Sequence, residues 1–313
     1  MNVLSLFDGM SGTQLALKKL GIKVDNYYAS EIDKYAIKVT QANFPNTKQL
    51  GDVTKLCFDV HIDLLVMGSP CQDLSFASRD KKGLEGERSG LFFEGLRLVK
   101  ACLAINPNLK VLVENVRMTK ANQDRMTKAL SDVMGQVIEP IAINSNIFSA
   151  QNRYRLYWTN LSIPTLPKDK GIVMNDILED GFSDRDKSFC IDASYFKGGN
   201  LRSYFEKNRR QLVFSKDGLC HVGNADLNGQ DAIKRVYHAN GKSPTLTTMQ
   251  GGHREPKVYI DNLQYRKLTP LECERLQTVP DNYTNHVSNT QRYKMLGNGF
   301  TIDVICHILS ELK

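Results

Sequence analysis

The sequence predicts an α/β fold built on a mostly parallel β-sheet, with a second, smaller lobe in the C-terminal half. Short aliphatic runs closed by Gly or Pro, such as residues 62–67, are typical of buried parallel strands. In the first half, segments with helical spacing of apolar residues separate these runs. Residues from about 165 to 260 lose this alternation and carry short strands and Gly turns, which indicates a second lobe. We therefore expect a sheet domain over 1–164, a lobe over 165–262, and a segment over 263–313 that returns to the sheet domain.

Composition narrows the class of protein without fixing its function. The chain has 313 residues, of which 41% are hydrophobic, so it can bury a substantial core. Its 41 Lys and Arg against 34 Asp and Glu give a net charge of +7, which suits a polyanionic partner but is also common among ordinary enzymes. The seven Cys form no C-x-x-C pair and no zinc-ligand spacing, so we expect a reducing compartment and no metal. Neither a secretion signal nor a membrane-spanning run is present, which predicts a cytoplasmic protein.

The chain opens with a strand, a Gly-bearing loop and a helix. Residues 3–7 are predicted as the strand, and the helix that follows ends at Gly21. Gly9 and Gly12 allow a tight turn and a close approach of backbone to a ligand, and the helix N-terminus offers N–H groups. Because the spacing is G-x-x-G and not G-x-G-x-x-G, a purely structural turn stays an alternative.

Acidic residues follow successive predicted strands. Asp8 follows the first strand, Glu31 the second, over residues 22–30, and Asp52 the third. The carboxyl ends of parallel strands meet at one sheet edge, so these acids could accept hydrogen bonds from the ribose and the amino group of an adenosyl ligand. The alternative is three unrelated, solvated carboxylates. Further helices are predicted over 34–43, capped by Asp33, and over 91–103, 120–134 and 301–312.

The strand over 62–67 runs into the sequence GSPCQ, which places Cys71 at the same edge of the sheet. Taken alone, a Cys in such a protein is more often a small buried hydrophobe than a nucleophile. Residues 73–90 are rich in charge and Gly and have little periodicity, so we expect a lid, although a connection without function fits as well.

A carboxylate and two cations join this edge from later strands. The strand over 109–113 delivers Glu114 near Cys71, unless Glu114 only caps or pairs locally. Within a predicted strand, Gln151, Arg153 and Arg155 share one face, because side chains alternate. Two cations beside a carboxylate could orient it or bind an anionic or carbonyl ligand, and a structural row of salt bridges is the other interpretation.

Together these motifs resemble, in order and spacing, those of the cytosine-C5 DNA methyltransferases. They are FDG at 7–9, Glu31, GDV at 51–53, SPCQ at 69–72, ENV at 114–116, Q-x-R-x-R at 151–155, RKLTPLECERLQ at 266–277 and GNGF at 297–300. The match covers most of the chain outside about 165–260 and is similar to compact bacterial or phage enzymes, with some likeness to the animal de novo subgroup. Two positions depart from the usual pattern: the first loop has a sparser Gly run, and Phe300 stands where Val is commoner.

The resemblance implies an S-adenosylmethionine-dependent, Rossmann-like methyltransferase fold and a covalent mechanism. Cys71 would attack C6 of a cytosine flipped out of duplex DNA, while Glu114 hydrogen-bonds N3 and the exocyclic amine. Arg155 would contact the cytosine carbonyl, and Arg153 would support the electrostatics of Glu114 and the thiolate. Methyl would pass to C5, leaving S-adenosylhomocysteine, and loss of the C5 proton would expel Cys71.

The resemblance also implies binding residues and partners. The implied cofactor residues are Phe7, Asp8, Gly9, Met10, Gly12, Glu31, Ile32, Asp52, Val53, Leu91 and Asn298. The implied DNA-reading candidates are Gln230, Arg235, Gln250, Gly251, Gly252 and Arg254. Six basic residues and one acid within 197–216 suit phosphate contacts, or else form a solvated charged face. We expect a monomer in a bacterial or phage-infected cell, associated with the nucleoid, that could act alongside a separate restriction endonuclease.

Three other hypotheses compete with duplex DNA methylation. The first is the tRNA-directed branch of the same family, although the long basic lobe favours DNA. The second is a catalytically silent DNA-binding relative, which intact Cys71, Glu114 and Arg155 disfavour. A dinucleotide oxidoreductase is the least supported, because G-x-G-x-x-G is missing.

Overall fold

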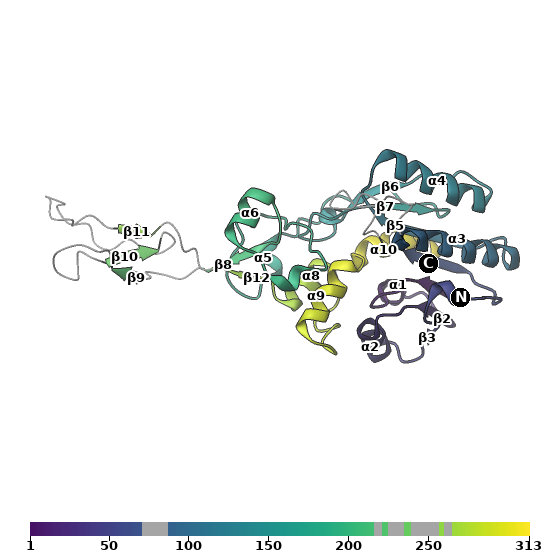
Figure 1. The fold of residues 1–313 in the computed structure, drawn as a ribbon, viewed down its shortest axis with the longest axis horizontal. Helices are drawn as coiled ribbons and strands as arrows, with labels where there is room; N and C mark the ends of the chain where they lie inside the picture. The colour runs from purple at the N-terminus through teal and green to yellow at the C-terminus, as the bar shows by residue number, and fades with distance from the viewer. Residues whose placement is uncertain (71–86, 216–220, 225–234, 239–256, 260–264) are drawn as a thin grey trace.

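A seven-stranded sheet forms the core of the larger part of the protein, at the right of Figure 1. The computed structural model describes residues 1–70, 87–215, 221–224, 235–238, 257–259 and 265–313. The strand order is β3-β2-β1-β4-β5-β7-β6. The strands are β1 (Asn2–Leu6), β2 (Asn26–Ser30), β3 (Lys48–Gln49), β4 (Leu64–Gly68), β5 (Lys110–Val116), β6 (Ile141–Asn144) and β7 (Tyr154–Thr159). The first five strands in this order pair in parallel, and only β7 runs antiparallel to its neighbours β5 and β6. The predicted mostly parallel α/β fold is confirmed.

The central strands are apolar along their length because both faces of the sheet are covered. In β4, Leu64 and Val66 belong to the hydrophobic cluster on one face, whereas Leu65 and Met67 belong to the cluster on the other. All four side chains are fully buried. This is the pattern expected of a parallel strand between two helical layers, and it explains the continuous aliphatic run in the sequence.

Helices form the two covering layers. They are α1 (Gly12–Leu20), α2 (Lys34–Asn43), α3 (Glu87–Ile105), α4 (Lys120–Met134) and α10 (Ile302–Leu309). Buried residues of α3 and α4 belong to one cluster, and those of α1, α2 and α10 to the other. The predicted helices 34–43 and 120–134 are confirmed, as is the cap: the Asp33 side chain accepts a hydrogen bond from the Tyr35 N–H at 2.9 Å.

The second strand is shorter than the sequence pattern predicts. It begins at Asn26, not at residue 22, because the residues before it form a turn against the start of β1. In this turn, the N-terminal ammonium of Met1 pairs with the Asp25 carboxylate at 2.6 Å, and the Asp25 N–H donates to the Met1 carbonyl at 2.8 Å.

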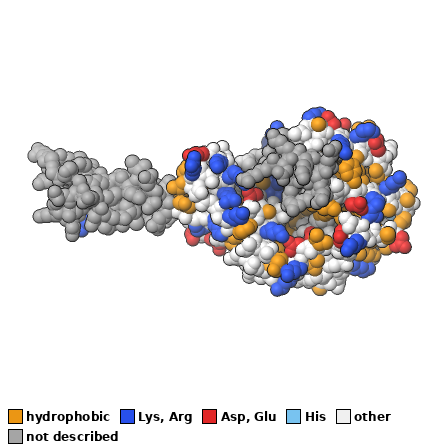
Figure 2. Space-filling view, in the orientation of Figure 1, with side chains coloured by type: hydrophobic (Ala, Val, Ile, Leu, Met, Phe, Trp, Pro, Cys, Tyr) orange, Lys and Arg blue, Asp and Glu red, His pale blue; other side chains and the backbone are white. Residues whose placement is uncertain are grey.

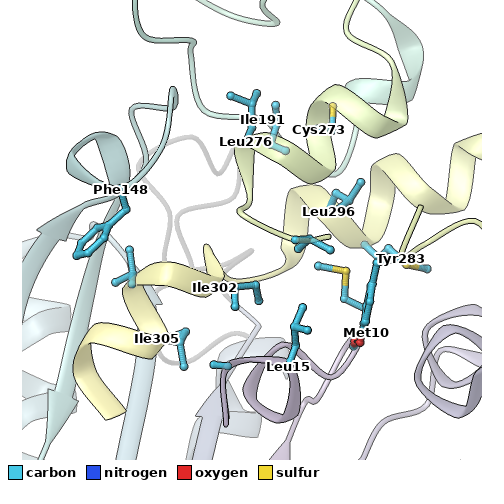
Figure 3. Packing of buried hydrophobic residues seen from close by; sticks show 14 of the residues in the cluster. Met10, Leu15, Phe148, Ile191, Cys273, Leu276, Tyr283, Leu296, Ile302 and Ile305 are labelled. Carbon is cyan, nitrogen blue, oxygen red and sulfur yellow. The ribbon is translucent and has the colours of Figure 1, made fainter. Parts of the chain in front are cut away.

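The C-terminal segment packs on the sheet domain. It contains α8 (Pro270–Leu276), α9 (Asn289–Asn298), α10 and the short 3-10 helix η5 (Ser310–Leu312). Figure 3 shows Ile302 and Ile305 of α10 lying beside Leu15 of α1, with Met10 of the first loop close by, and all four belong to one buried cluster. The last and first parts of the chain therefore share a core.

A smaller lobe extends from the sheet domain (Figure 1). Its described elements are α5 (Met174–Ile177), η4 (Tyr195–Lys197), α6 (Leu201–Lys207), the two-stranded sheet of β8 (Leu212–Phe214) and β12 (Tyr265–Lys267), and the three-stranded sheet of β9 (His221–Asn224), β10 (Arg235–His238) and β11 (Lys257–Tyr259). Ile191 and Tyr195 belong to the cluster that also covers the main sheet. The predicted boundaries at 164 and 262 stay predictions.

Lys and Arg side chains gather on this lobe in Figure 2. Within the described part of the predicted basic stretch, two of them have acidic partners: Arg202 pairs with Glu206 at 2.9 Å, and Arg209 pairs with Asp192 at 3.3 Å.

In the part of the chain that is described, no helix combines the length and apolar character needed to cross a membrane.

Candidate active site

The ends of the parallel strands bring the predicted site residues to one edge of the sheet. Strands β2, β1, β4 and β5 are neighbours in that order and point the same way, so the residues that follow them are adjacent in space. These residues are Phe7 to Gly9 after β1, Glu31 after β2, Gly68 at the end of β4, and Glu114 near the end of β5.

Glu31 ties the first loop to the end of β2. Its Oε2 accepts a hydrogen bond from the Gly9 N–H, and its Oε1 accepts from the N–H groups of Ile32 and Asp33, all at 2.8 Å. Gly9 has φ +60° and no atom within 4 Å of the position a Cβ would take. A glycine is therefore required by the backbone conformation, and open space adjoins it.

The other predicted cofactor residues differ in exposure. Ile32 is 77% exposed, Asn298 is exposed, and Asp52 is half-buried, with its Oδ1 accepting from the Thr54 N–H at 3.0 Å. Met10 and Val53 are buried, so their side chains pack in the core. Phe7 and Leu91 are partly buried against the α3 side of the sheet. Their contacts with a cofactor stay predictions.

Asp8 points into the protein, away from the open side of the loop. Its Oδ2 accepts from the Ser11 hydroxyl and its Oδ1 from the Tyr27 hydroxyl, each at 2.7 Å. Burial raises the pKa of Asp8 to about 6 despite these hydrogen bonds. Both carboxylate oxygens are thus used to hold the loop.

Glu114 is a buried carboxyl at the end of β5. Burial raises its pKa above the ordinary value, although the charges of Arg155 and Arg153 oppose this. Arg155 Nε lies 3.1 Å from Glu114 Oε1. In the sheet register Glu114 pairs with Gly68, and its Oε2 lies 3.4 Å from where a Gly68 Cβ would be. The carboxyl therefore adjoins the strand end that leads into Cys71.

The predicted polar row of residues 151, 153 and 155 is only partly formed. Strand β7 begins at Tyr154, so Gln151 and Arg153 precede it, and Gln151 forms an isolated bridge with Ser188. The prediction of one strand across this motif was wrong, because its first residues pair with a segment from the later part of the chain. Only Arg155 lies in the strand.

The Arg153 guanidinium donates hydrogen bonds mainly to backbone carbonyls, and it acts on Glu114 through its charge. Its Nη2 donates to the carbonyls of Gly297 and Gly299 at 3.1 and 2.8 Å, and its Nη1 donates to the Ile191 carbonyl at 3.2 Å. The side chain is almost fully buried. Arg153 thereby fixes the turn between α9 and α10, whose Phe300 ring lies 3.0 Å from a Cβ built at Gly68.

Several predicted residues lie outside the described residues. They are Cys71, the lid over 73–86, and the base-reading candidates Gln230, Gln250, Gly251, Gly252 and Arg254. Arg235 is described, at the start of β10, and is exposed.

The match to a known protein family decides what this geometry belongs to. The family of C-5 cytosine-specific DNA methylases matches residues 1–313. The chain belongs to this family. Among similar proteins, "Orphan methyltransferase M.SPBetaI" of Bacillus phage SPbeta is 29% identical over 100% of this chain and 97% of its own length. "Type II methyltransferase M.HhaI" of Haemophilus parahaemolyticus is 28% identical over 98% of this chain and 93% of its own length.

Solved structures agree on the fold. The Entamoeba histolytica methyltransferase EhMeth is similar with a TM-score of 0.67 at 17% identity, covering 100% of this chain and 99% of its own. A Spodoptera frugiperda DNMT2 mutant is similar with a TM-score of 0.63 at 20% identity, covering 99% and 98%. This C-5 cytosine-specific methylase is a DNA (cytosine-5-)-methyltransferase, and the family uses S-adenosylmethionine. The predicted family, reaction and cofactor are confirmed.

Two residues that contact this methylase's site region escaped the sequence analysis. Gln277, the last residue of the 266–277 motif, is fully buried and donates to the Leu296 carbonyl at 2.6 Å. Its place as the last residue of the quoted motif was an available signal. Cys190 lies 3.3 Å from Arg153 Nη1, and its position inside the less regular lobe offered no motif.

Proposed function

We propose that this enzyme methylates cytosine in duplex DNA and that Cys71, Glu114, Arg153 and Arg155 carry the reaction. The observation that supports this most is Glu114: a buried carboxyl with a raised pKa, paired with Arg155 and adjacent to Gly68. Gly68 stands three residues before Cys71 in the sequence. A carboxyl and a guanidinium therefore lie beside the strand end that precedes Cys71 in the sequence.

The strand-end residues fit S-adenosylmethionine. Open space adjoins the left-handed Gly9 and Gly51, which lets a ligand approach the backbone closely. Ile32 presents an unusually exposed aliphatic side chain next to Glu31, suited to the flat face of an adenine, and Glu31 and Asp52 are suited to hydroxyl and amino donors. When bound, S-adenosylmethionine supplies the electrophilic methyl group.

The protein groups then divide the chemistry. The Cys71 thiolate forms a bond to C6, which makes C5 nucleophilic, and the C5–methyl bond forms next. Glu114, kept protonated to a higher pH by its raised pKa, donates to N3 and accepts from the exocyclic amine, and so accommodates the charge on the ring. Arg155 donates to the cytosine carbonyl. The C5 proton leaves to solvent, and its bonding electrons restore the ring double bond as the C6–S bond breaks.

Access requires the base to leave the duplex, which costs a few kcal/mol of unpairing and unstacking. The exposed cations of the lobe, such as Lys197, Lys207 and Arg209, are suited to phosphates, which position the duplex without reading it. We keep Arg235 and the undescribed Gln230, Gln250, Gly251, Gly252 and Arg254 as the base-reading candidates, because Arg and Gln can form paired hydrogen bonds to guanine and adenine.

The test is transfer of labelled methyl from S-adenosylmethionine to unmethylated duplex DNA, followed by single-base mapping of methylcytosine. We expect Cys71→Ala to abolish transfer and the adduct with 5-fluorocytosine DNA, and Glu114→Gln to lower kcat by about a hundredfold or more. Glu139→Gln, which changes an exposed Glu, is the matched control and should retain full activity. Full activity of Cys71→Ala would refute the assignment, and transfer to tRNA alone would refute duplex DNA as substrate.

We further propose a monomer that needs no metal and works in the cytoplasm on nucleoid DNA, with or without a separate restriction endonuclease. Relatives named both "orphan" and "type II" support either setting. Light scattering that shows a monomer on DNA, and full activity in a chelator, are the expected results. A dimeric mass or loss of activity on chelation would contradict them.

A further inference from the structure

A second thiol lies beside the proposed catalytic groups. Residues 188–191 pair with the segment just before β7: the Ser188 N–H donates to the Ala150 carbonyl at 2.7 Å, and the Asn152 N–H donates to the Ser188 carbonyl at 3.0 Å. The Ile191 N–H donates to Gln151 Oε1 at 3.1 Å. This pairing fixes the backbone on both sides of Cys190 and holds its side chain next to the two arginines.

The sulfur lies in a row with the two arginines and Glu114. Arg153 Nη1 lies 3.3 Å from Cys190 Sγ, and Arg155 Nη2 lies 4.0 Å from the same sulfur. Arg155 Nε in turn lies 3.1 Å from Glu114 Oε1. The second sulfur contact is long for a hydrogen bond, so it acts mainly through charge. Cys190 thus lies between two guanidinium groups that would otherwise repel each other.

Cys190 is exposed as a residue, and its sulfur lies against the two guanidinium groups. Desolvation of the sulfur would raise its pKa, but the charges and hydrogen bonds of Arg153 and Arg155 outweigh this and lower the pKa below the ordinary value. Among the described residues, the titratable groups that act on the two arginines also include Glu114 on β5 and Tyr157 on β7. The turn at 297–300 contributes only carbonyls, which also favour the cations.

We propose that Cys190 is a positioning residue of the methyl-transfer reaction, whose sulfur bridges Arg153 and Arg155 so that Arg155 stays aligned on Glu114. This inference rests on the roles proposed above for Glu114 and Arg155. Arg153 is anchored on the Gly297 and Gly299 carbonyls, so the sulfur links Arg155 to a fixed point of the fold. Without that sulfur, Arg155 would lose its link to the anchored Arg153.

The first experiment compares Cys190→Ala, which removes the sulfur, with Cys190→Asp, which keeps an acceptor for the two guanidinium groups. Cys190→Ala should lower kcat about tenfold, with the KM for S-adenosylmethionine unchanged, and Cys190→Asp should recover most of the loss. Cys57→Ala, at an exposed cysteine away from this row, is the matched control and should leave kcat unchanged. Equal thermal midpoints for all variants are expected. A tenfold loss that Cys190→Asp does not recover, with a lowered midpoint, would mean a structural role and overturn the proposal.

The second experiment reads the charge of the thiol without using activity. In full-length Cys71→Ala protein, alkylation of Cys190 by iodoacetamide is followed against pH by peptide mass spectrometry. The midpoint should lie below that of a free cysteine and rise when Arg155→Met is added. An unchanged midpoint would overturn the proposal.

Activity measurements distinguish the role of Cys190 from the role of Glu114. Loss of activity in Glu114→Gln with full kcat in Cys190→Ala overturns the role of Cys190 alone. Full activity in both variants overturns the proposed function and the inference together.

Discussion

The buried Asp8 carboxyl should make the free energy of unfolding depend on pH, and the structure gives the size of this effect. Its side chain is 7% exposed, and burial raises its pKa from the ordinary 3.8 to about 6. A difference of about two in pKa corresponds to about 3 kcal/mol between the protonated and ionised forms. Because the folded-state pKa lies above the unfolded value, the contribution to stability is present below about pH 4 and is lost as pH rises through about 6.

The Asp8→Asn variant should not lose this stability as pH rises, because an amide does not ionise. The amide oxygen can still accept from the Tyr27 hydroxyl, and the amide N–H can donate to the Ser11 hydroxyl, which itself lies 3.3 Å from Gln14 Oε1. The variant should therefore match the parent near pH 4 and exceed it at pH 7 by up to about 3 kcal/mol. The assay is urea unfolding at a series of pH values, followed by the fluorescence of the single, fully buried Trp158.

Asp303→Asn is the control with the opposite sign. Burial would raise the pKa of Asp303, but hydrogen bonds and charges from Lys170 and Lys19 lower it overall. Its contribution is present above the ordinary carboxyl range and is lost in acid, so this variant should be less stable at pH 7. A pH-independent difference between Asp8→Asn and the parent, or a less stable Asp8→Asn at pH 7, would refute the reasoning. Cofactor affinity of Asp8→Asn should stay within a few-fold, since both oxygens face inward.

Two further substitutions test the packing around the site. A Cβ at Gly297 would lie 2.3 to 2.4 Å from backbone atoms of residues 192–193, so Gly297→Ala should lower the free energy of unfolding by about 3 kcal/mol or more. Gly90→Ala, where the added Cβ meets open space, is the control and should not lower it. Urea unfolding midpoints of the two variants measure the difference. Glu274→Gln should cost about 3–5 kcal/mol, because it leaves the buried Arg292 guanidinium without its carboxylate; a thermal midpoint equal to the parent's would contradict this.

Local sequence signals predicted the elements of the fold well. Helix α2 has the predicted bounds, because its cap, Asp33, hydrogen-bonds only two residues away, at Tyr35. Gly21 ends α1 in the left-handed conformation for the same local reason. Such interactions lie within a turn of the chain, where spacing alone reveals them. The order of the strands is not local, and the antiparallel insertion of β7 between β5 and β6 was not predicted.

The acidic residues of the motif at 266–277 have a structural role that their spacing in the sequence does not reveal. Its acidic residues Glu272 and Glu274 are completely buried, although nothing in their spacing distinguishes them from a solvated helix face. Glu272 pairs with Arg266 at 2.8 Å, and Glu274 pairs with Arg292 at 3.1 Å. Both acids need an arginine in the fold because an unpaired buried charge is costly. The resemblance located the motif, but only the structure gives its physical role, which is to join α8 to α9 and β12.

The contacts of Arg153 could not be predicted from the alternation of side chains along a strand. Period-two spacing placed it with Gln151 and Arg155 on one face, a rule that considers only the residue's own strand. Its strongest contacts are instead to Gly297 and Gly299, 144 and 146 residues later in the chain. The positive charge of the same side chain opposes the rise in the pKa of Glu114, and its hydrogen bonds hold the turn between α9 and α10. A substitution of Arg153 would therefore change both. In the function proposed above, this arrangement would tie the chemistry at Glu114 to the docking of the C-terminal segment.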